Sequence, residues 1–157
     1  MTMSLLIISV SSLSAQNASD ILRPDMGMKL GVCPVCGMDI TERMFTRVTL
    51  FAGDTAAYAC GLGCAAALML ERQWDSIRVV DFDSLKTVPA LGACYLFGSR
   101  IVPARAMLPV LSFASRESAL RFQQRHGGTV LCGKEAFDAA SRIRRERMNS
   151  SKKGQRS

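Results

Sequence analysis

Apolar and polar residues alternate in short segments of the chain, and this period of two predicts half-buried β-strands. Phe45 to Phe51 alternates in this way, and Thr55 to Ala59 is its expected partner across a hairpin turn at Ala52-Gly53-Asp54. The β-branched run from Ile77 to Phe82 predicts a third strand. Between the second and third strands we expect a helix over 62–73, with an inward face made of Leu62, Ala66, Met69 and Leu70. Residues 45–82 therefore predict a ββαβ unit.

The same order of elements recurs in the second half of the chain. Ala93 to Gly98, Val110 to Phe113 and Thr129 to Cys132 have the composition of strands. Ser115 is an N-cap residue for the intervening helix, which ends at Gly127-Gly128 and has Ala119 and Phe122 facing inward. The fold class that we predict is α+β, with two ββαβ halves, about 45–82 and 93–132, forming one small domain over 30–140.

The C-terminal residues combine a helical start with a strongly basic end. Lys134 to Arg147 should start as a helix, packed through Ala136, Phe137, Ala140 and Ile143, and then fray into the basic tail. The chain of 157 residues carries a net charge of +7, of which residues 142–157 contribute +6. We therefore predict a basic disordered tail over 141–157, with an acidic partner or an anionic membrane surface as its contact. The folded part is nearly neutral and does not have the basic face of a nucleic-acid-binding domain.

The first fifteen residues, MTMSLLIISVSSLSA, have the pattern of a secretory signal. An uncharged apolar core from Leu5 to Val10 precedes mostly small residues, and we expect cleavage after Ala15 and a linker over 16–29. The alternative is the frayed N-terminus of a cytosolic protein. Export implies a periplasmic or other oxidising location, where the six cysteines serve as disulfides, metal ligands or both.

Four of the cysteines form two closely spaced pairs. Cys33 and Cys36 enclose two residues, and Cys60 and Cys64 enclose three at the predicted junction of a strand and a helix. Four thiolates at these spacings suit a tetrahedral Zn(II) site, so a zinc-stapled structural or interaction module is one interpretation. Two disulfides in an exported protein are another. A thiol oxidoreductase is a third, although it requires an exposed Cys33, and a turn and a hairpin rather than a helix follow this pair.

Methionine residues favour a softer metal. Met38 directly follows Cys36-Gly37, and Met107 lies in a segment without an amphipathic helical pattern. Thioether and thiolate ligands select Cu(I), whereas thioether is rarely a zinc ligand. His126, the only histidine, lies at the predicted end of a helix, where a histidine commonly interacts with the helix dipole. One histidine excludes a multi-histidine centre within the chain, and no nucleophile-elbow or phosphate-binding glycine motif occurs, so we do not expect an enzyme.

Several of these motifs together resemble the NosL family, the copper-binding accessory proteins of nitrous oxide reductase. The motifs are CPVCGM (Cys33 to Met38), YLFGS (Tyr95 to Ser99), Met107 with a proline two residues later, and FASRESALRFQQRHGGTVL (Phe113 to Leu131). The resemblance covers about residues 30–138 and implies a periplasmic, often lipid-anchored Cu(I) metallochaperone with two ββαβ halves. It also implies the copper ligands: Cys36 and Met38 with Cys33 beside them, and Met107 and His126 from the second half.

The sequence departs from this family at two places. No cysteine follows the predicted signal, so we expect a soluble or signal-tethered form. Cys60 and Cys64, within YACGLGC, are more similar to the Cys-rich TRASH modules, and with Cys94 and Cys132 they could form a second metal site, a disulfide or one sulfur-rich pocket. We predict a carrier that delivers Cu(I) to a copper enzyme, such as nitrous oxide reductase, or to a membrane-bound assembly complex. Zn(II) at a second Cys-rich site and a role in heavy-metal tolerance are the remaining alternatives.

Overall fold

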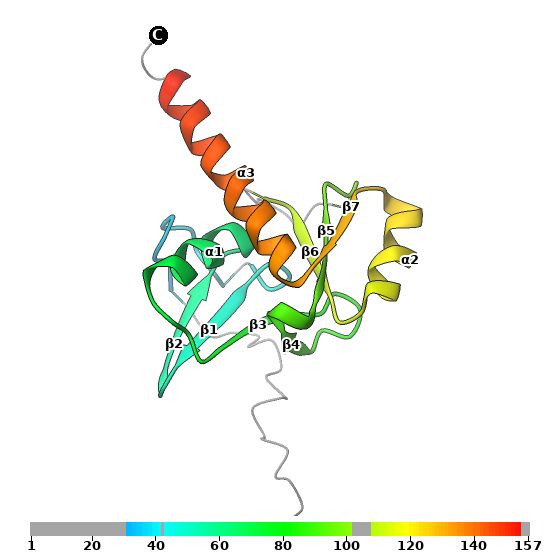
Figure 1. Cartoon of the computed structure of the whole chain (residues 1–157), viewed down its shortest axis with the longest axis horizontal. Helices are drawn as coiled ribbons and strands as arrows, with labels where there is room; N and C mark the ends of the chain where they lie inside the picture. Colours follow the sequence, from blue (N-terminus) through cyan, green and yellow to red (C-terminus); the bar gives the residue numbers. More distant parts are fainter. Residues whose placement is uncertain (1–30, 42, 102–107, 155–157) are drawn as a thin grey trace, which may run out of the picture.

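The computed structural model describes residues 31–41, 43–101 and 108–154 (Figure 1). The predicted signal segment, the predicted linker and Met107 lie outside these residues. Within the described part of the chain, no helix is both long enough and apolar enough to cross a lipid bilayer.

The first half is built on a four-stranded antiparallel sheet with the strand order β2-β1-β3-β4. Its elements are β1 (Val48–Ala52), β2 (Thr55–Ala59), α1 (Leu62–Glu71), β3 (Ser76–Val80) and β4 (Thr87–Pro89). Ala52 pairs with Thr55, so the hairpin turns at Gly53 and Asp54, and Gly53 supplies the positive φ (55°) that such a turn favours. The predicted ββαβ order is confirmed, and β4 is added to it.

The second half repeats this order around a smaller sheet with the strand order β6-β5-β7. After a short 3-10 helix, η2 (Ala90–Gly92), come β5 (Cys94–Phe97), β6 (Val110–Phe113), α2 (Arg116–His126) and β7 (Thr129–Cys132). Ser115 caps α2 by accepting a hydrogen bond of 3.1 Å from the Ser118 amide, and Ala119 and Phe122 are buried as predicted. The α+β class with two ββαβ halves is therefore confirmed.

The two halves are joined where the end of β3 contacts β6. The Ser112 hydroxyl donates to the Val80 carbonyl, and the Ala114 amide donates to the Asp81 carboxylate, each over 2.8 Å. The ring of Phe82 then packs edge-on against Phe113 of the second core, with 5.9 Å between ring centroids. Polar and aromatic contacts together hold the two sheets in one packed domain.

A third helix, α3 (Gly133–Gly154), continues the chain beyond both sheets. Its first turns pack on the core of the first half through Ala136, Phe137 and Ala140, and its later turns extend away from the domain (Figure 1). The predicted disordered tail is therefore wrong for residues 141–154, which are helical. Because the packed turns already carry the cost of nucleation, each following residue adds to the helix at little further cost.

Smaller predictions also differ from the structure. The first strand begins at Val48 because residues 44–46 form a turn, and α1 ends two residues earlier than predicted, at Glu71. Leu70, which was expected to face inward, is 78% exposed. β4 has only three residues, includes Pro89 and lies at the edge of its sheet, where proline is tolerated.

Candidate metal centre

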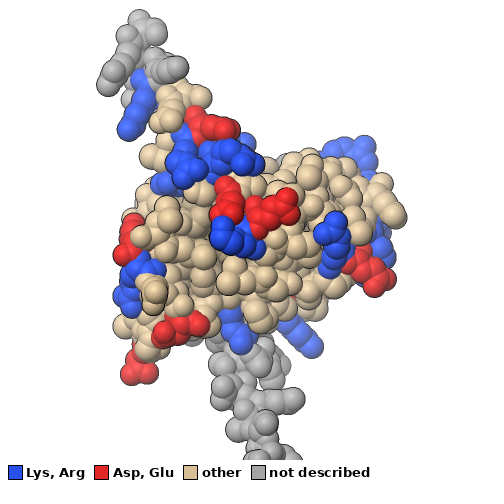
Figure 2. Space-filling view, viewed as in Figure 1, with Lys and Arg blue, Asp and Glu red and all other residues tan. Residues whose placement is uncertain are grey.

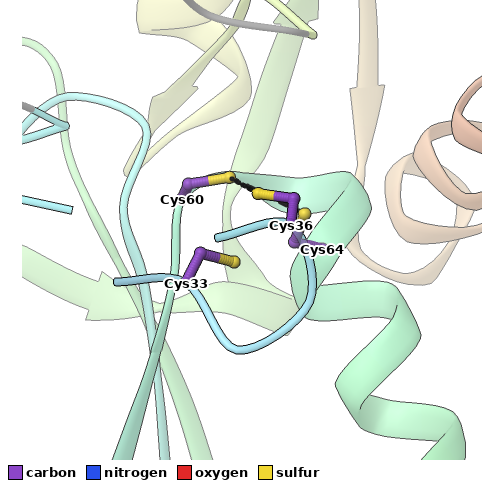
Figure 3. A group of neighbouring side chains, drawn as sticks. All are labelled: Cys33, Cys36, Cys60 and Cys64. Carbon is purple, nitrogen blue, oxygen red and sulfur yellow. Dashed lines mark hydrogen bonds between the residues drawn. The ribbon is translucent and has the colours of Figure 1, made fainter. Parts of the chain in front are cut away.

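The first cysteine pair lies in a tight loop before β1. The Gly37 amide donates to the Cys33 carbonyl and the Cys33 amide donates to the Met38 carbonyl, each over 2.8 Å. Gly37 has a φ of 71°, which glycine adopts at little cost. The loop thereby directs the side chains of Cys33 and Cys36 toward the same point (Figure 3).

The second pair lies where β2 passes into α1. Cys60 follows the last residue of β2, and Cys64 is in the first turn of α1. The Thr46 hydroxyl donates to the Cys60 carbonyl over 2.8 Å, which fixes the junction against the turn before β1. The N-terminus of a helix carries a partial positive charge, so the first turn of α1 favours a thiolate at Cys64.

The two pairs form one cluster (Figure 3). The sulfur atoms of Cys33, Cys36, Cys60 and Cys64 all lie within 4.8 Å of one another. Cys36 Sγ is 3.4 Å from Cys60 Sγ, which in turn is 3.6 Å from Cys64 Sγ. Four thiolates bound to one ion at a bond length of about 2.3 Å would be separated by about 3.8 Å, which is the scale of this cluster. The pairs therefore share one site, which fits a soft or borderline ion, and Cys60 and Cys64 do not form a separate second site.

Hydrogen bonding among the thiols separates their pKa values. The Cys60 thiol donates to Cys64 Sγ, which raises the pKa of Cys60 and lowers the pKa of Cys64 to about 6. Burial raises the pKa of Cys36. A metal ion that binds here therefore displaces protons, because every thiol must be deprotonated to act as a ligand.

The cluster is closed on one side and accessible on the other. Cys33 and Cys64 are 1% and 6% exposed, whereas Cys36 and Cys60 are half-buried. Cys60 and Cys64 also line a narrow pocket of about 40 Å³, whose walls include Met38 and Leu108. Structural zinc sites are closed, so an accessible face is more typical of an ion that is exchanged.

The other predicted metal ligands are distributed unevenly. Met38 is half-buried and lines the same pocket as the cysteines. Met107 lies outside the described residues, and Leu108, the next residue, lines the pocket. His126 is at the end of α2, where its ring packs on Phe122 with 4.3 Å between ring centroids, and it is not part of the cysteine cluster. Met38 is thus beside the thiols, whereas His126 belongs to a different neighbourhood.

The remaining two cysteines form a disulfide, one of the three alternatives that the sequence left open. Cys94 and Cys132 are paired residues of β5 and β7, and their sulfur atoms are bonded. Arg116 lies over this bond, with its guanidinium 3.9 Å from Cys132 Sγ. The sulfur chemistry of the second half is therefore separate from that of the cluster.

Sequence reasoning missed the arginines of the site. Arg43, Arg144 and Arg147 line the pocket together with the cysteines and Met38. A signal was present, because Ala140, Arg144 and Arg147 are spaced by four and three residues and continue one helical face. The predicted helix included these positions, but the basic residues after Ser141 were interpreted as a disordered tail, so the arginines were not assigned to the site.

Comparison with known proteins identifies the fold. No protein-family profile matches the chain, and no curated protein matches its sequence. The structure is similar to the crystal structure of the copper chaperone NosL from Shewanella denitrificans, with a TM-score of 0.55 and 21% sequence identity over 67% of this chain and 88% of that chain. At this identity the similarity establishes a shared fold. The resemblance to the NosL family that the motifs indicated is thus confirmed at the level of the fold.

Proposed function

We propose that this protein binds Cu(I) and passes it to another copper protein, without a catalytic turnover of its own. The observation that carries the proposal is the cluster of four thiols that opens, through Cys60 and Cys64, into a pocket lined by Met38. Thiolates and thioethers are the soft ligands that select Cu(I). The similarity in fold to a copper chaperone supports the same function.

The ligands have different proposed roles. Cys33 and Cys64 are buried and retain the ion, although Cys64 also borders the pocket. The half-buried Cys60 holds the ion at the pocket, with the half-buried Cys36 beside it. Met38 is the thioether at the pocket, and Met107 is a second candidate there because it directly precedes Leu108 in the chain. The assignment of His126 as a displaceable, pH-sensitive ligand rests on the resemblance of the motifs alone.

A zinc-stapled interaction module is the second candidate. The number of sulfurs and the burial of Cys33 and Cys64 favour it, because structural zinc is bound by four enclosed ligands. It predicts that removal of the metal unfolds the protein and that Met38 is dispensable. We do not propose a thiol oxidoreductase, because that function requires an exposed Cys33 and this residue is 1% exposed.

The proposed setting is the periplasm, after export directed by residues 1–15. The proposed partner is a copper enzyme or a membrane-bound complex that assembles one, with nitrous oxide reductase as the enzyme that the motifs suggest. Copper or other heavy-metal tolerance is the alternative use of the same carrier.

The deciding experiment is a competitive titration of the protein lacking residues 1–15, with its cluster thiols reduced and its disulfide intact, against Cu(I) and Zn(II). We expect tight Cu(I) binding and weak Zn(II) binding, with circular dichroism unchanged because the chain is folded before it binds. Tight Zn(II) binding that folds the chain would instead establish the zinc-stapled module.

Single variants then test the ligand roles. Met38→Leu, Met107→Leu and His126→Ala should each weaken Cu(I) affinity, by about tenfold, with little change in folding. Met69→Leu is the matched control, because Met69 is a half-buried residue of α1 that does not line the cysteine pocket. An affinity for Cu(I) that is unchanged in all three variants would remove the thioethers and the histidine from the site.

A further inference from the structure

The pocket over the cysteines is bordered by basic side chains. Arg43, Arg144 and Arg147 contribute to its walls, and no Asp or Glu among the described residues does. Arg43 comes from the segment before β1 and is 8% exposed, whereas Arg144 and Arg147 come from successive turns of α3. The open side of the metal cluster is therefore bordered by guanidinium groups.

Two of these arginines belong to a longer basic segment, which we define as residues 142–152 of α3. It contains one acidic residue, Glu146, and five basic residues: Arg142, Arg144, Arg145, Arg147 and Lys152. Most of its side chains are exposed, and Figure 2 shows basic side chains gathered where this helix leaves the domain. The basic segment is therefore accessible to another molecule along most of its length.

Close packing fixes the basic segment beside the cluster. α3 crosses α1 at Gly63, where an added Cβ would lie 3.4 Å from the Ala140 carbonyl oxygen and from Arg144 Cβ. Gly63 immediately precedes Cys64 in the chain, so this crossing holds Arg144 near the sulfur atoms.

A positive border of this kind discriminates among incoming molecules. It repels a free metal cation and attracts anionic groups, and such fields change encounter rates by tenfold or more at low ionic strength. A copper protein that carries carboxylates around its own soft ligand would be attracted to the border and could still deliver a sulfur atom into the pocket. The charges therefore suit an acidic protein better than a free ion.

We propose that the basic segment is a docking surface for an acidic protein partner, whose carboxylates contact Arg144 and Arg147 while its sulfur ligand enters the pocket above Cys60 and Cys64. This inference rests on the proposed function. In the exchange, a bond from the partner's sulfur to Cu(I) forms before a cysteine–copper bond breaks. Copper stays Cu(I), and the released thiolate either remains charged beside Arg144 or takes a proton from water.

The test compares two acceptor peptides that differ only in flanking charge. Both contain the same Met-x-x-Met motif, flanked either by glutamates or by lysines, and both receive copper from the Cu(I)-loaded protein in a stopped-flow experiment. We expect transfer to the acidic peptide to be at least about fivefold faster at low salt, with the difference lost at about 0.5 M salt.

Charge-removing variants localise the effect. Arg144→Gln/Arg147→Gln should reduce the preference for the acidic peptide to less than about twofold, since the two charges nearest the pocket are gone. The matched control is Arg121→Gln/Arg125→Gln, which removes two charges from α2 in the other half and should keep the preference. If both double variants lose the preference for the acidic peptide equally, the net charge of the protein, and not a docking surface, sets the transfer rate.

A metal-free measurement separates this inference from the proposed function. The acidic peptide with leucine in place of methionine carries a fluorophore, and its anisotropy reports docking to the metal-free protein. If the labelled peptide docks but the protein does not bind Cu(I), the proposed function is overturned and the docking surface remains. If the protein binds Cu(I) but neither docks the labelled peptide nor prefers the acidic acceptor peptide, this inference alone is overturned. A third outcome would overturn the inference of a protein partner in favour of a membrane surface. In that outcome the protein binds vesicles with anionic lipids, Arg144→Gln/Arg147→Gln abolishes this binding, and the two peptides receive copper at equal rates.

Discussion

The two halves share the order ββαβ but use their cysteines in opposite ways. The first half holds four free thiols in one cluster, whereas the second joins Cys94 to Cys132 across the paired strands β5 and β7. Thiols that converge on one point form a site for an ion, and thiols on neighbouring strands form a cross-link. The same residue type therefore forms a candidate metal site in one half and a covalent cross-link in the other.

The two halves also differ in the size of the side chains that they pack. In the core of the second half the rings of Phe113 and Phe122 pack together with Phe82, which the first half contributes, and the three centroids are 5.2 to 5.9 Å apart. In the first half α1 instead buries small residues, including Gly63, Ala65 and Ala66. An aromatic cluster fills its core with large rigid side chains, while a surface of small residues lets a second helix approach closely. The small residues of α1 therefore allow α3 to pack closely beside the candidate metal centre.

The largest expected effect concerns the disulfide. Cys94→Ala/Cys132→Ala should lower the free energy of unfolding by about 4 kcal/mol, because the bond closes a loop with a sequence separation of 38 residues. Urea unfolding followed by circular dichroism measures this loss. Cu(I) affinity of the folded variant should be unchanged, and a parallel fall in affinity would mean that the halves are not independent in function.

The next effect concerns the cluster. Cys60→Ser should reduce Cu(I) affinity at least a hundredfold, equivalent to about 2.8 kcal/mol, because Cys60 lies between Cys36 and Cys64. Even the loss of a residue that only hydrogen-bonds a metal ligand costs about 10- to 100-fold in affinity. Competition with a chromogenic Cu(I) chelator provides the measurement. Urea unfolding of metal-free Cys60→Ser should match that of the wild-type protein within about 1 kcal/mol. Unfolding of the variant would instead assign the thiol a structural role.

The smallest effect concerns the helix starts, which also differ between the halves. Ser115→Ala should lower stability by about 1 kcal/mol, because the Ser118 amide loses its cap. Ser150→Ala, on the exposed end of α3, is the control and should change stability by less than about 0.5 kcal/mol. Gly61, the N-cap residue of α1, offers no side-chain cap, so the first turn of the helix that carries Cys64 lacks the stabilisation that Ser115 gives to α2. Hydrogen exchange measures the protection of the backbone amides in the first turn of each helix. Stronger protection in the first turn of α1 than in that of α2 would contradict this comparison.

Much of the fold could be predicted because the signals are local. The strand Thr55–Ala59 and the helix that follows Ser115 depend on turn residues, a cap and a periodic pattern within a few positions. β4 was missed because three residues ending in proline give no periodic signal. The start of the last helix was predicted, but its continuation to Gly154 was not. The composition of residues 141–154 resembles a disordered tail, while their conformation depends on the packed turns before them.

Only part of the site could be predicted, for the same reason. The spacings within Cys33–Cys36 and Cys60–Cys64 indicated a metal site, but 23 residues separate the pairs, and only the tertiary fold decides whether they meet. The disulfide partners are farther apart still, and strand register selects them. Arg144 reaches the site through a helix crossing, which depends on the volume of a residue in another element.

That crossing has an evolutionary consequence. Gly63 sets the separation of α3 from the sulfur atoms without itself being a ligand. A Cβ at this position would make ordinary contact with α3, whereas a side chain longer than alanine would push α3 away from α1 and leave the backbone supports of the four thiols in place. Under the proposed function, the rate of copper release could therefore change with the volume of this one residue while the affinity for copper stays the same.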